Sequence, residues 1–280
     1  MGESVSIAAA LQSKSEIFAA NRATGHIDLS VAASGRVTRR QRVLEDGSLR
    51  VRFPNAEHAA LEAVLVNTAG GIAGGDRFAV SLELGAGSSL IAGTAAAEKV
   101  YRSAGANSEI SLNVDIDDGA SLAWLPQEMI LFDEARLSRR IEIDLAEDAS
   151  LVLAEALVFG RSAMGEKVTQ GLLVDRWRVR RGNKLVFAEN TRLDGPIAAK
   201  LARPAVANGS IAIATMLIAP GSDAVLAAVR ALEFAGEVGI SAWNGIAVAR
   251  LCAKSGAALR HDLIALLGAL KQPLPRLWTN

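Results

Sequence analysis

Apolar and polar residues alternate with a period of two through most of this 280-residue chain. Such alternation is typical of β-strands with one buried face, because successive side chains on a strand point to opposite sides. The apolar positions of six segments are Ile27, Leu29 and Val31; Leu49, Val51 and Phe53; Phe78, Val80, Leu82 and Leu84; Ile110, Leu112, Val114 and Ile116; Ile141, Ile143 and Leu145; and Leu173, Trp177 and Val179, with Asp175 between them. The chain is therefore predicted to be mainly β.

The turns between these segments resemble one another. "EDGSLRV", "GAGSSLIA", "DDGASLAW" and "EDASLVLA" each place small turn residues before a leucine that starts a strand. These leucines are Leu49, Leu90, Leu122 and Leu151, and the last three lie about thirty residues apart. A repeat of strand, tight turn and strand buries its apolar face by stacking on its neighbours, so the pattern predicts solenoid-like layered β-sheets. A plain β-sandwich is the alternative.

Helices are predicted only near the end of the chain. Ser222 is a suitable N-cap for one helix, which we expect to end at Gly236. A second helix is predicted from about Gly256, and Pro273 and Pro275 end it. We expect both C-terminal helices to dock on the β body, and the apolar run "LIALLGAL" in the second suggests a partner interface.

Composition limits the domain organisation and the class of partner. No linker rich in proline or serine divides the chain, so we expect one domain over residues 25–280 after a weakly ordered segment, 1–24. Thirty basic residues balance thirty acidic ones, which argues against a general affinity for nucleic acid or an anionic membrane. The single cysteine, Cys252, excludes a disulfide framework and fits a reducing compartment. We identify no signal peptide and no membrane span.

The glycine-rich stretch "NTAGGIAGGD", residues 67–76, raises the question of a phosphate-binding loop. Gly70 and Gly75 have the spacing of a Walker motif, but Asp76 stands where that motif needs lysine. A carboxylate at this position repels phosphate. The stretch is therefore predicted to be a tight turn in which glycines adopt positive φ.

Two acidic residues interrupt apolar strands. Glu155 lies in the middle of "SLVLAEALVFG", which has the composition of a strand buried on both faces, and Glu189 follows Leu185 and Phe187 in phase. A buried carboxylate costs several kcal/mol unless it is paired, hydrogen-bonded, protonated or in contact with water. Two interpretations remain open: an ion pair with an arginine such as Arg161 or Arg192, or a functional polar path.

Six segments, in order, resemble the urease accessory protein family UreD, called UreH in some organisms. They are "NTAGGIAGGD", "EKVYRSAG" (98–105), "LAWLPQEMILF" (122–132), "LVFGRSAMGEKVTQG" (157–171), "FAENTRLDG" and the terminal "PRLW". Their order and spacing hold over roughly residues 25 to 278. The chain departs from the family at Thr68 and Ala69, where prolines are usual, and in "TAAAEKVYRS", which lacks a proline and a second threonine.

The resemblance implies a cytoplasmic urease chaperone without enzymatic activity or a tightly bound cofactor. It would have an all-β, solenoid-like body with two helices. Such a protein binds UreF directly, and UreF recruits the GTPase UreG. The assembly loads nickel into the urease apoprotein, as part of nitrogen metabolism, and nickel passes through an internal, water-filled tunnel of the UreD-like protein.

The resemblance also places four residues along this transient nickel path. They are Asp76, Ser103, Glu155 and Glu189. Carboxylates and water suit a hydrated dication that must leave again, whereas a cysteine thiolate would hold it too tightly.

Two other classes of function remain open from the residues. One is a solenoid-type carbohydrate-active enzyme that uses Glu155 and Glu189 as paired acids, which requires carboxyls roughly 5–10 Å apart in an open cleft. The other is a purely structural interaction module. The histidines form no HExxH motif and no recognisable triad with a GxSxG serine; they are His26, His58 and His261.

Overall fold

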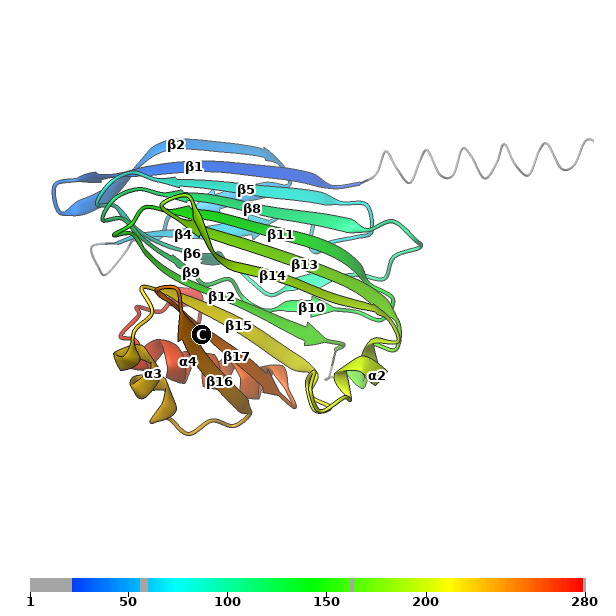
Figure 1. Cartoon of the computed structure of the whole chain (residues 1–280). Coiled ribbons are helices and arrows are strands. Elements are labelled where there is room, and N and C mark those ends of the chain that lie inside the picture. Colours follow the sequence, from blue (N-terminus) through cyan, green and yellow to red (C-terminus); the bar gives the residue numbers. More distant parts are fainter. Residues whose placement is uncertain (1–21, 56–59, 162–163, 279–280) are drawn as a thin grey trace, which may run out of the picture.

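Two β-sheets face each other across one interior in the computed structural model, which describes residues 22–55, 60–161 and 164–278 (Figure 1). The first sheet contains, in hydrogen-bonded order, β14 (Lys184–Gly195), β13 (Gly171–Arg181), β11 (Arg136–Leu145), β8 (Ser108–Ile116), β5 (Arg77–Leu84), β1 (Thr24–Ser34) and β2 (Val37–Gly47). The second contains β16 (Glu237–Trp243), β17 (Ile246–Ala253), β15 (Ala212–Ala219), β12 (Ser150–Phe159), β9 (Ser121–Trp124), β6 (Ser89–Thr94), β4 (Leu61–Asn67) and β3 (Leu49–Arg52). The short strands β7 (Glu98–Val100) and β10 (Met129–Leu131) join the second sheet, since β10 pairs with both β12 and β7.

The repeat predicted from the turns is present in the fold. The chain passes from β5 to β6, from β8 to β9 and from β11 to β12, each time from the first sheet to the second through a tight turn. Leu90, Leu122 and Leu151 are register partners on the parallel strands β6, β9 and β12. Leu49 lies instead on the antiparallel strand β3, opposite Asn67, so the first of the four similar turns does not belong to this ladder. The predicted all-β, solenoid-like layering is confirmed.

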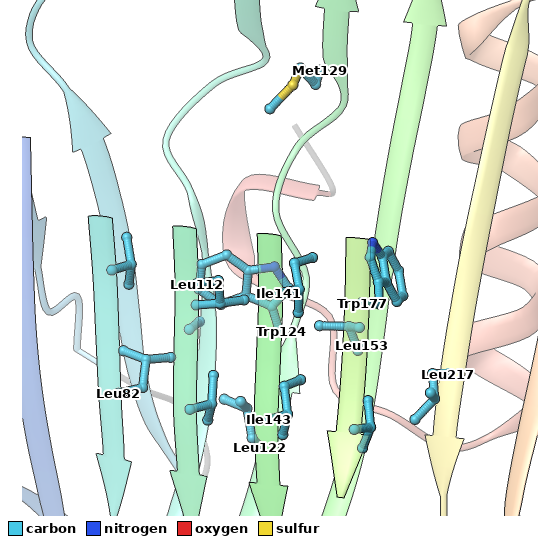
Figure 2. Close-up of a cluster of buried hydrophobic side chains, with 14 of the residues drawn as sticks. Leu82, Leu112, Leu122, Trp124, Met129, Ile141, Ile143, Leu153, Trp177 and Leu217 are labelled. Atoms are coloured by element: carbon cyan, nitrogen blue, oxygen red, sulfur yellow. The ribbon is translucent and has the colours of Figure 1, made fainter. Parts of the chain in front are cut away.

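The apolar phase of each strand faces the interior between the sheets. Figure 2 shows side chains from facing strands meeting there, among them Leu82, Leu112 and Ile141 of the first sheet and Leu122 and Leu153 of the second. All five are at most 3 % exposed. The burial of so many aliphatic side chains in one layer is the main contribution to the stability of the fold.

Strand β12 is buried on both faces, as its apolar sequence predicts. Leu153 and Leu157 pack in the interior between the sheets. Ala154, Ala156 and Val158 belong to a second core on the opposite face of the same sheet. This second core is closed by a C-terminal helix, so β12 lies in the middle of three layers.

The two predicted C-terminal helices are α3 (Asp223–Arg230) and α4 (Gly256–Ala269). The hydroxyl oxygen of Ser222 accepts the N–H of Val225 at 3.3 Å and so caps α3, and Ser255 caps α4 in the same way. The structure adds a short helix, α2 (Ile197–Leu201), and a 3₁₀ turn, η2 (Arg276–Trp278). These shorter elements were not predicted.

The predicted end of the first C-terminal helix was wrong. Helix α3 ends at Arg230 rather than at Gly236, and the Gly236 N–H donates to the Asp262 carboxylate at 2.8 Å within the loop that enters β16. The apolar run in α4 is buried by this chain itself. Leu263, Leu266 and Leu267 are at most 2 % exposed in the core that covers the second sheet, so packing within this chain accounts for these apolar residues, and the partner interface stays a prediction.

The predicted weakly ordered segment, residues 1–24, lies almost wholly outside the described residues, and β1 starts at Thr24. Among the helices that the structure describes, none has both the length and the apolar character to span a bilayer.

Candidate functional site

A cavity of about 100 Å³ lies between the two sheets. Residues of both sheets line it, for example Ile110 and Ile141 of the first and Leu65 and Met129 of the second. Several polar side chains interrupt the apolar wall: Asn67, Thr94, Glu98, Ser111, Gln127, Arg139 and Glu155. A cavity of this size with several polar partners can hold a few water molecules.

Glu98 is the acid in this wall with the fewest partners. Its side-chain carboxylate accepts one hydrogen bond in the described structure, from the Asn67 amide at 3.1 Å. Burial raises the pKa of Glu98, and the Asn67 hydrogen bond only partly opposes this. Glu98 therefore presents oxygen atoms that are not committed to an arginine.

The glycine-rich turn forms part of the wall of this cavity. Asn67, its first residue, donates to both Glu98 and the carbonyl of Gly71, and Ile72 is a buried part of the cavity wall. Gly71 has a φ of +149°, and a Cβ there would lie 2.4 Å from the ring of Tyr101. The prediction of a tight turn with positive φ is confirmed at Gly70, Gly71 and Gly75.

Asp76 closes the turn through main-chain hydrogen bonds. Its Oδ1 accepts the N–H of Ala23 at 2.9 Å, and its Oδ2 accepts the N–H of Ala73 at 2.7 Å. The residue is 3 % exposed. Asp76 thus joins the start of β1 to the turn, and both of its oxygens have a donor.

Ser103 lies beside the same turn. Its hydroxyl donates to the carbonyl of Ala106 at 2.5 Å and accepts the N–H of Gly105 at 3.1 Å. A Cβ on Gly74 would lie 2.1 Å from the Ser103 hydroxyl oxygen, so only glycine fits between them. The structure therefore brings Asp76 and Ser103 to one region, at the end of the layered body.

Glu155 belongs to a buried ion network that bridges the two sheets. The guanidinium of Arg139, on β11, donates to Glu155 on β12 and to both oxygens of Asp175 on β13, at 3.0 Å from Nε and 2.6 Å from Nη2. Two tryptophan indoles complete the network: Trp124 donates to Glu155 at 2.8 Å and Trp177 to Asp175 at 3.0 Å. All three charged side chains are less than a tenth exposed. The arrangement holds two carboxylates on one arginine.

Because Arg139 is shared, two buried acids depend on a single cation in this network. Burial raises the pKa of Glu155, and the attraction of Arg139 and the Trp124 hydrogen bond only partly offset it. Burial lowers the pKa of Arg139, but Asp175 and Glu155 outweigh this, so its pKa is raised and the guanidinium stays charged.

Glu189 lies elsewhere, at the edge of the first sheet. Its carboxylate forms a two-point ion pair with Arg250 on β17, with 2.6 Å between Nη1 and Oε1, and it also accepts the hydroxyl of Thr191 at 2.8 Å. The Arg250 side chain is 51 % exposed. Glu189 thus joins the two sheets through an ion pair near the surface and does not line the cavity.

The four predicted path residues do not converge on one site. Asp76 and Ser103 share the turn, Glu155 lines the cavity, and Glu189 holds the sheet edge. Within the described ranges, no group of three or more His, Cys, Asp and Glu side chains could hold a metal ion. The suggested arginine partners were wrong, because Arg161 pairs with Glu166 and Arg192 with Asp194.

Three residues of the site were not predicted from the sequence: Glu98, Arg139 and Asp175. Arg139 continues the inward phase of Ile141 and Ile143, and Asp175 lies between Leu173 and Trp177. An arginine and an acid at inward-facing positions indicate a buried ion pair, so the pairing of Arg139 with Asp175 could have been predicted from the sequence. Glu98 lies on a three-residue strand that shows no such phase.

Comparison with known proteins assigns the family. The family model described as UreD urease accessory protein matches residues 23–279. A "Urease accessory protein UreD" of Rhodopseudomonas palustris (strain BisA53) is 57 % identical over 270 residues, covering 96 % of this chain and 94 % of the relative. One from Rhodopseudomonas palustris (strain ATCC BAA-98 / CGA009) is 58 % identical, with 95 % and 96 % covered. "Urease accessory protein UreD 3" of Bradyrhizobium sp. (strain BTAi1 / ATCC BAA-1182) is 56 % identical, again with 95 % and 96 % covered. The layered β fold, the order of the six motifs and these matches agree, and the chain belongs to the UreD family of urease accessory proteins.

Proposed function

We propose that this protein is a cytoplasmic urease maturation chaperone that binds UreF and, through UreF, UreG, and joins them to the urease apoprotein. Nickel is its cargo and passes through the cavity between the sheets. Membership of the UreD family supports the role in urease maturation. The observation that carries the nickel path is a cavity of about 100 Å³, with a mainly apolar wall, in which Glu98 offers carboxylate oxygens without a cationic partner.

The chemistry of the cavity wall fits transient passage of a dication. Oxygen and amide groups such as those of Glu98, Asn67 and Gln127 bind a hydrated divalent ion weakly, and the sole cysteine lies outside the wall. Glu155 also lines the cavity, but its carboxylate is engaged in an ion pair with Arg139. Glu98 is therefore the acid that meets nickel inside the body, and Glu155 shapes the wall.

The competing enzyme hypothesis receives less support from the geometry. A glycosidase needs one free carboxyl with a raised pKa and a second carboxylate across an open cleft. Here Glu155 is bound to Arg139 and lies in the interior, and Glu189 is bound to Arg250 at the sheet edge. We propose that the protein has no catalytic activity of its own.

The test is co-expression with urease, UreF and UreG, followed by affinity capture and measurement of nickel per urease active site. The wild-type chain should capture UreF and urease apoprotein. Glu98→Ala should leave capture unchanged and lower the nickel content several-fold. The matched control is Glu109→Ala, which removes a surface carboxylate whose side chain is 60 % exposed. Full nickel loading by the Glu98 variant would refute the cavity as the path, and failure of the wild type to capture either protein would refute the chaperone role.

A further inference from the structure

The second sheet is interrupted beside the cavity. Strand β9 pairs with β12 as far as Trp124, and β10 resumes the pairing with β12 at Met129. The four residues between them, 125–128, belong to no strand, and Figure 2 shows Trp124 and Met129 on either side of this break. The side chains of Gln127 and Glu155, which line the cavity, lie at the break. The cavity wall is therefore formed here by one irregular segment instead of by paired strands.

This part of the wall is one residue thick. A second, smaller hollow, of about 10 Å³, lies on the other side of the segment, between the sheet and α4. Pro126 lines both spaces, while Gln127 lines the cavity and Glu128 lines the hollow. A hollow of this size holds about one water molecule. A single residue thus separates the interior cavity from a space that leads toward the outer face of the sheet.

The 3₁₀ turn η2 covers the break from outside. The indole of Trp278, which also lines the small hollow, donates to the carbonyl of Leu125 at 2.9 Å. In the other direction, the side-chain amide of Gln127 donates to the carbonyl of Leu277 at 2.9 Å. The turn is therefore bonded directly to the irregular segment, and one of these bonds comes from a side chain that lines the cavity.

Arg260 of α4 completes the cover. Its guanidinium donates to the amide oxygen of Gln127 and, at 2.6 Å, to the carboxylate of Glu128, and it lies 5.6 Å from the centre of the Trp278 ring. The side chains of Arg260 and Glu128 are 28 % and 26 % exposed, so this ion pair reaches the surface. While the guanidinium is in place, its charge repels a dication. When Arg260 withdraws, a carboxylate and an amide oxygen are left free at the break, and both are oxygen ligands that suit a hydrated divalent ion.

The turn can leave this position without breaking a strand or a helix. It consists of three residues, 276–278, and residues 270–275, which join it to α4, belong to no helix or strand. Its first residue, Arg276, donates its main-chain N–H to Glu62 at 3.1 Å. A segment held by a few side-chain hydrogen bonds opens at a lower free energy than paired strands do.

We propose that the break between β9 and β10 is a mouth of the cavity, that η2 and Arg260 form its removable cover, and that Glu128 is the acid that meets nickel there. The main-chain N–H of Glu98 donates to the carbonyl of Glu128 at 3.0 Å, so the two acids lie on adjacent segments. Glu98 lines the cavity and Glu128 lines the small hollow, which makes them successive ligands on one route. The choice of nickel as cargo rests on the proposed function, whereas the position of the mouth rests on the geometry of the break.

The first experiment measures access to the cavity and needs neither nickel nor a partner. Met129 lines the cavity, and Cys252 is the only cysteine, so Met129→Cys in a Cys252→Ser background places a single thiol behind the break. Methyl methanethiosulfonate transfers its methylthio group to this thiol as a mixed disulfide and releases methanesulfinate and a proton. The rate of this reaction reports how often the cavity is open to solvent.

Two variants weaken the cover, and one serves as control. Trp278→Ala and Arg260→Met should each raise the labelling rate several-fold. Arg230→Met, which removes a guanidinium that donates to the carbonyl of Ile240 from α3, should leave the rate unchanged. Labelling is measured well below the melting temperature of each variant, so that global unfolding does not contribute. If Trp278→Ala does not fold, Arg260→Met decides. An unchanged rate in the folded cover variants overturns the proposal, and so does an equal increase in the control.

The second experiment tests Glu128 in the co-expression assay. Glu128→Gln keeps an acceptor for Arg260 but loses the charge, so capture of UreF and urease should be unchanged and the nickel content of urease should fall several-fold. The matched control is Glu142→Gln, which removes a carboxylate 3.7 Å from Arg140 whose side chain is 39 % exposed. Full nickel loading by the Glu128 variant overturns the mouth as part of the nickel route, while a loss of loading in Glu98→Ala keeps the proposed function. If the wild-type chain captures neither protein, the proposed function fails, and the labelling rates alone decide whether the mouth exists.

Discussion

Removing Arg139 should destabilise the protein far more than removing Arg250. Both arginines join the first sheet to the second through a carboxylate, so Arg139→Met and Arg250→Met are the same chemical change in two environments. The Arg139 side chain is 3 % exposed and the Arg250 side chain 51 %. Arg139→Met leaves Glu155 and Asp175 buried without a cation, which costs about 3–5 kcal/mol. The exposed pair contributes at most about 1 kcal/mol.

The assay is equilibrium unfolding in urea, followed by tryptophan fluorescence, because Trp124 and Trp177 donate hydrogen bonds to the two acids. A loss of 3–5 kcal/mol is a large part of the roughly 5–15 kcal/mol that stabilises a typical domain. The Arg139 variant should therefore unfold at a much lower urea concentration than the Arg250 variant. Similar urea midpoints for the two variants would show that burial does not determine how much each ion pair contributes to stability.

The pH dependence of the stability of Arg139→Met tests whether the buried acids destabilise the fold through their charge. Without the cation, burial holds the pKa of Glu155 in the folded protein further above its value in the unfolded chain. A group with a raised folded pKa favours folding at pH values below its unfolded pKa, and this contribution is lost as the pH rises through the folded pKa. The gap in stability between Arg139→Met and the wild type should thus narrow from pH 8 to pH 5. A gap that widens on acidification refutes the reasoning.

Three further outcomes follow from the glycine turn and the cavity. Glu98→Gln should raise the melting temperature at pH 8 and leave it almost unchanged at pH 4. The reason is that burial raises the pKa of this carboxyl, so only its charged form destabilises the fold. A lower melting temperature of the variant at pH 8 would contradict this. Asp76→Asn should lower the free energy of unfolding in urea by about 1–3 kcal/mol, since an amide has one acceptor oxygen for two main-chain N–H groups. Gly71→Ala should lower the melting temperature more than Gly70→Ala. Both glycines have positive φ, but an added Cβ would overlap the ring of Tyr101 only at Gly71, and equal losses would exclude that overlap as the cause.

Much of the fold was predictable because it follows from local patterns. Alternation in each strand identifies the buried face, and the turn-Ser-Leu repeat places Leu90, Leu122 and Leu151 in equivalent positions. A stacked repeat brings equivalent positions side by side, so sequence spacing becomes spatial register. Leu49 shows the limit of this reasoning, since a similar turn precedes an antiparallel strand that pairs in a hairpin instead.

The candidate site was less predictable because its contacts cross between the sheets. Arg139 and Glu155 are 16 residues apart in sequence, and Arg139 and Asp175 are 36 apart, so their pairing depends on the register of three strands. Glu98 meets Asn67 only because the glycine turn folds back on β7. Local secondary-structure propensity carries no information on contacts between residues far apart in sequence. The inward-facing position of a charged residue in its strand does indicate that it needs a buried partner.

The position of β12 between two cores has a consequence for synthesis of the chain. Ala154, Ala156 and Val158 lie under α4, whose residues, 256–269, are made about a hundred residues after them. Until that late segment has left the ribosome, the outer face of the second sheet remains an apolar surface without its cover. Exposed apolar sheet faces of this kind associate with one another. A nascent chain of this protein therefore stays vulnerable to aggregation until α4 has been made, although most of its strands already exist.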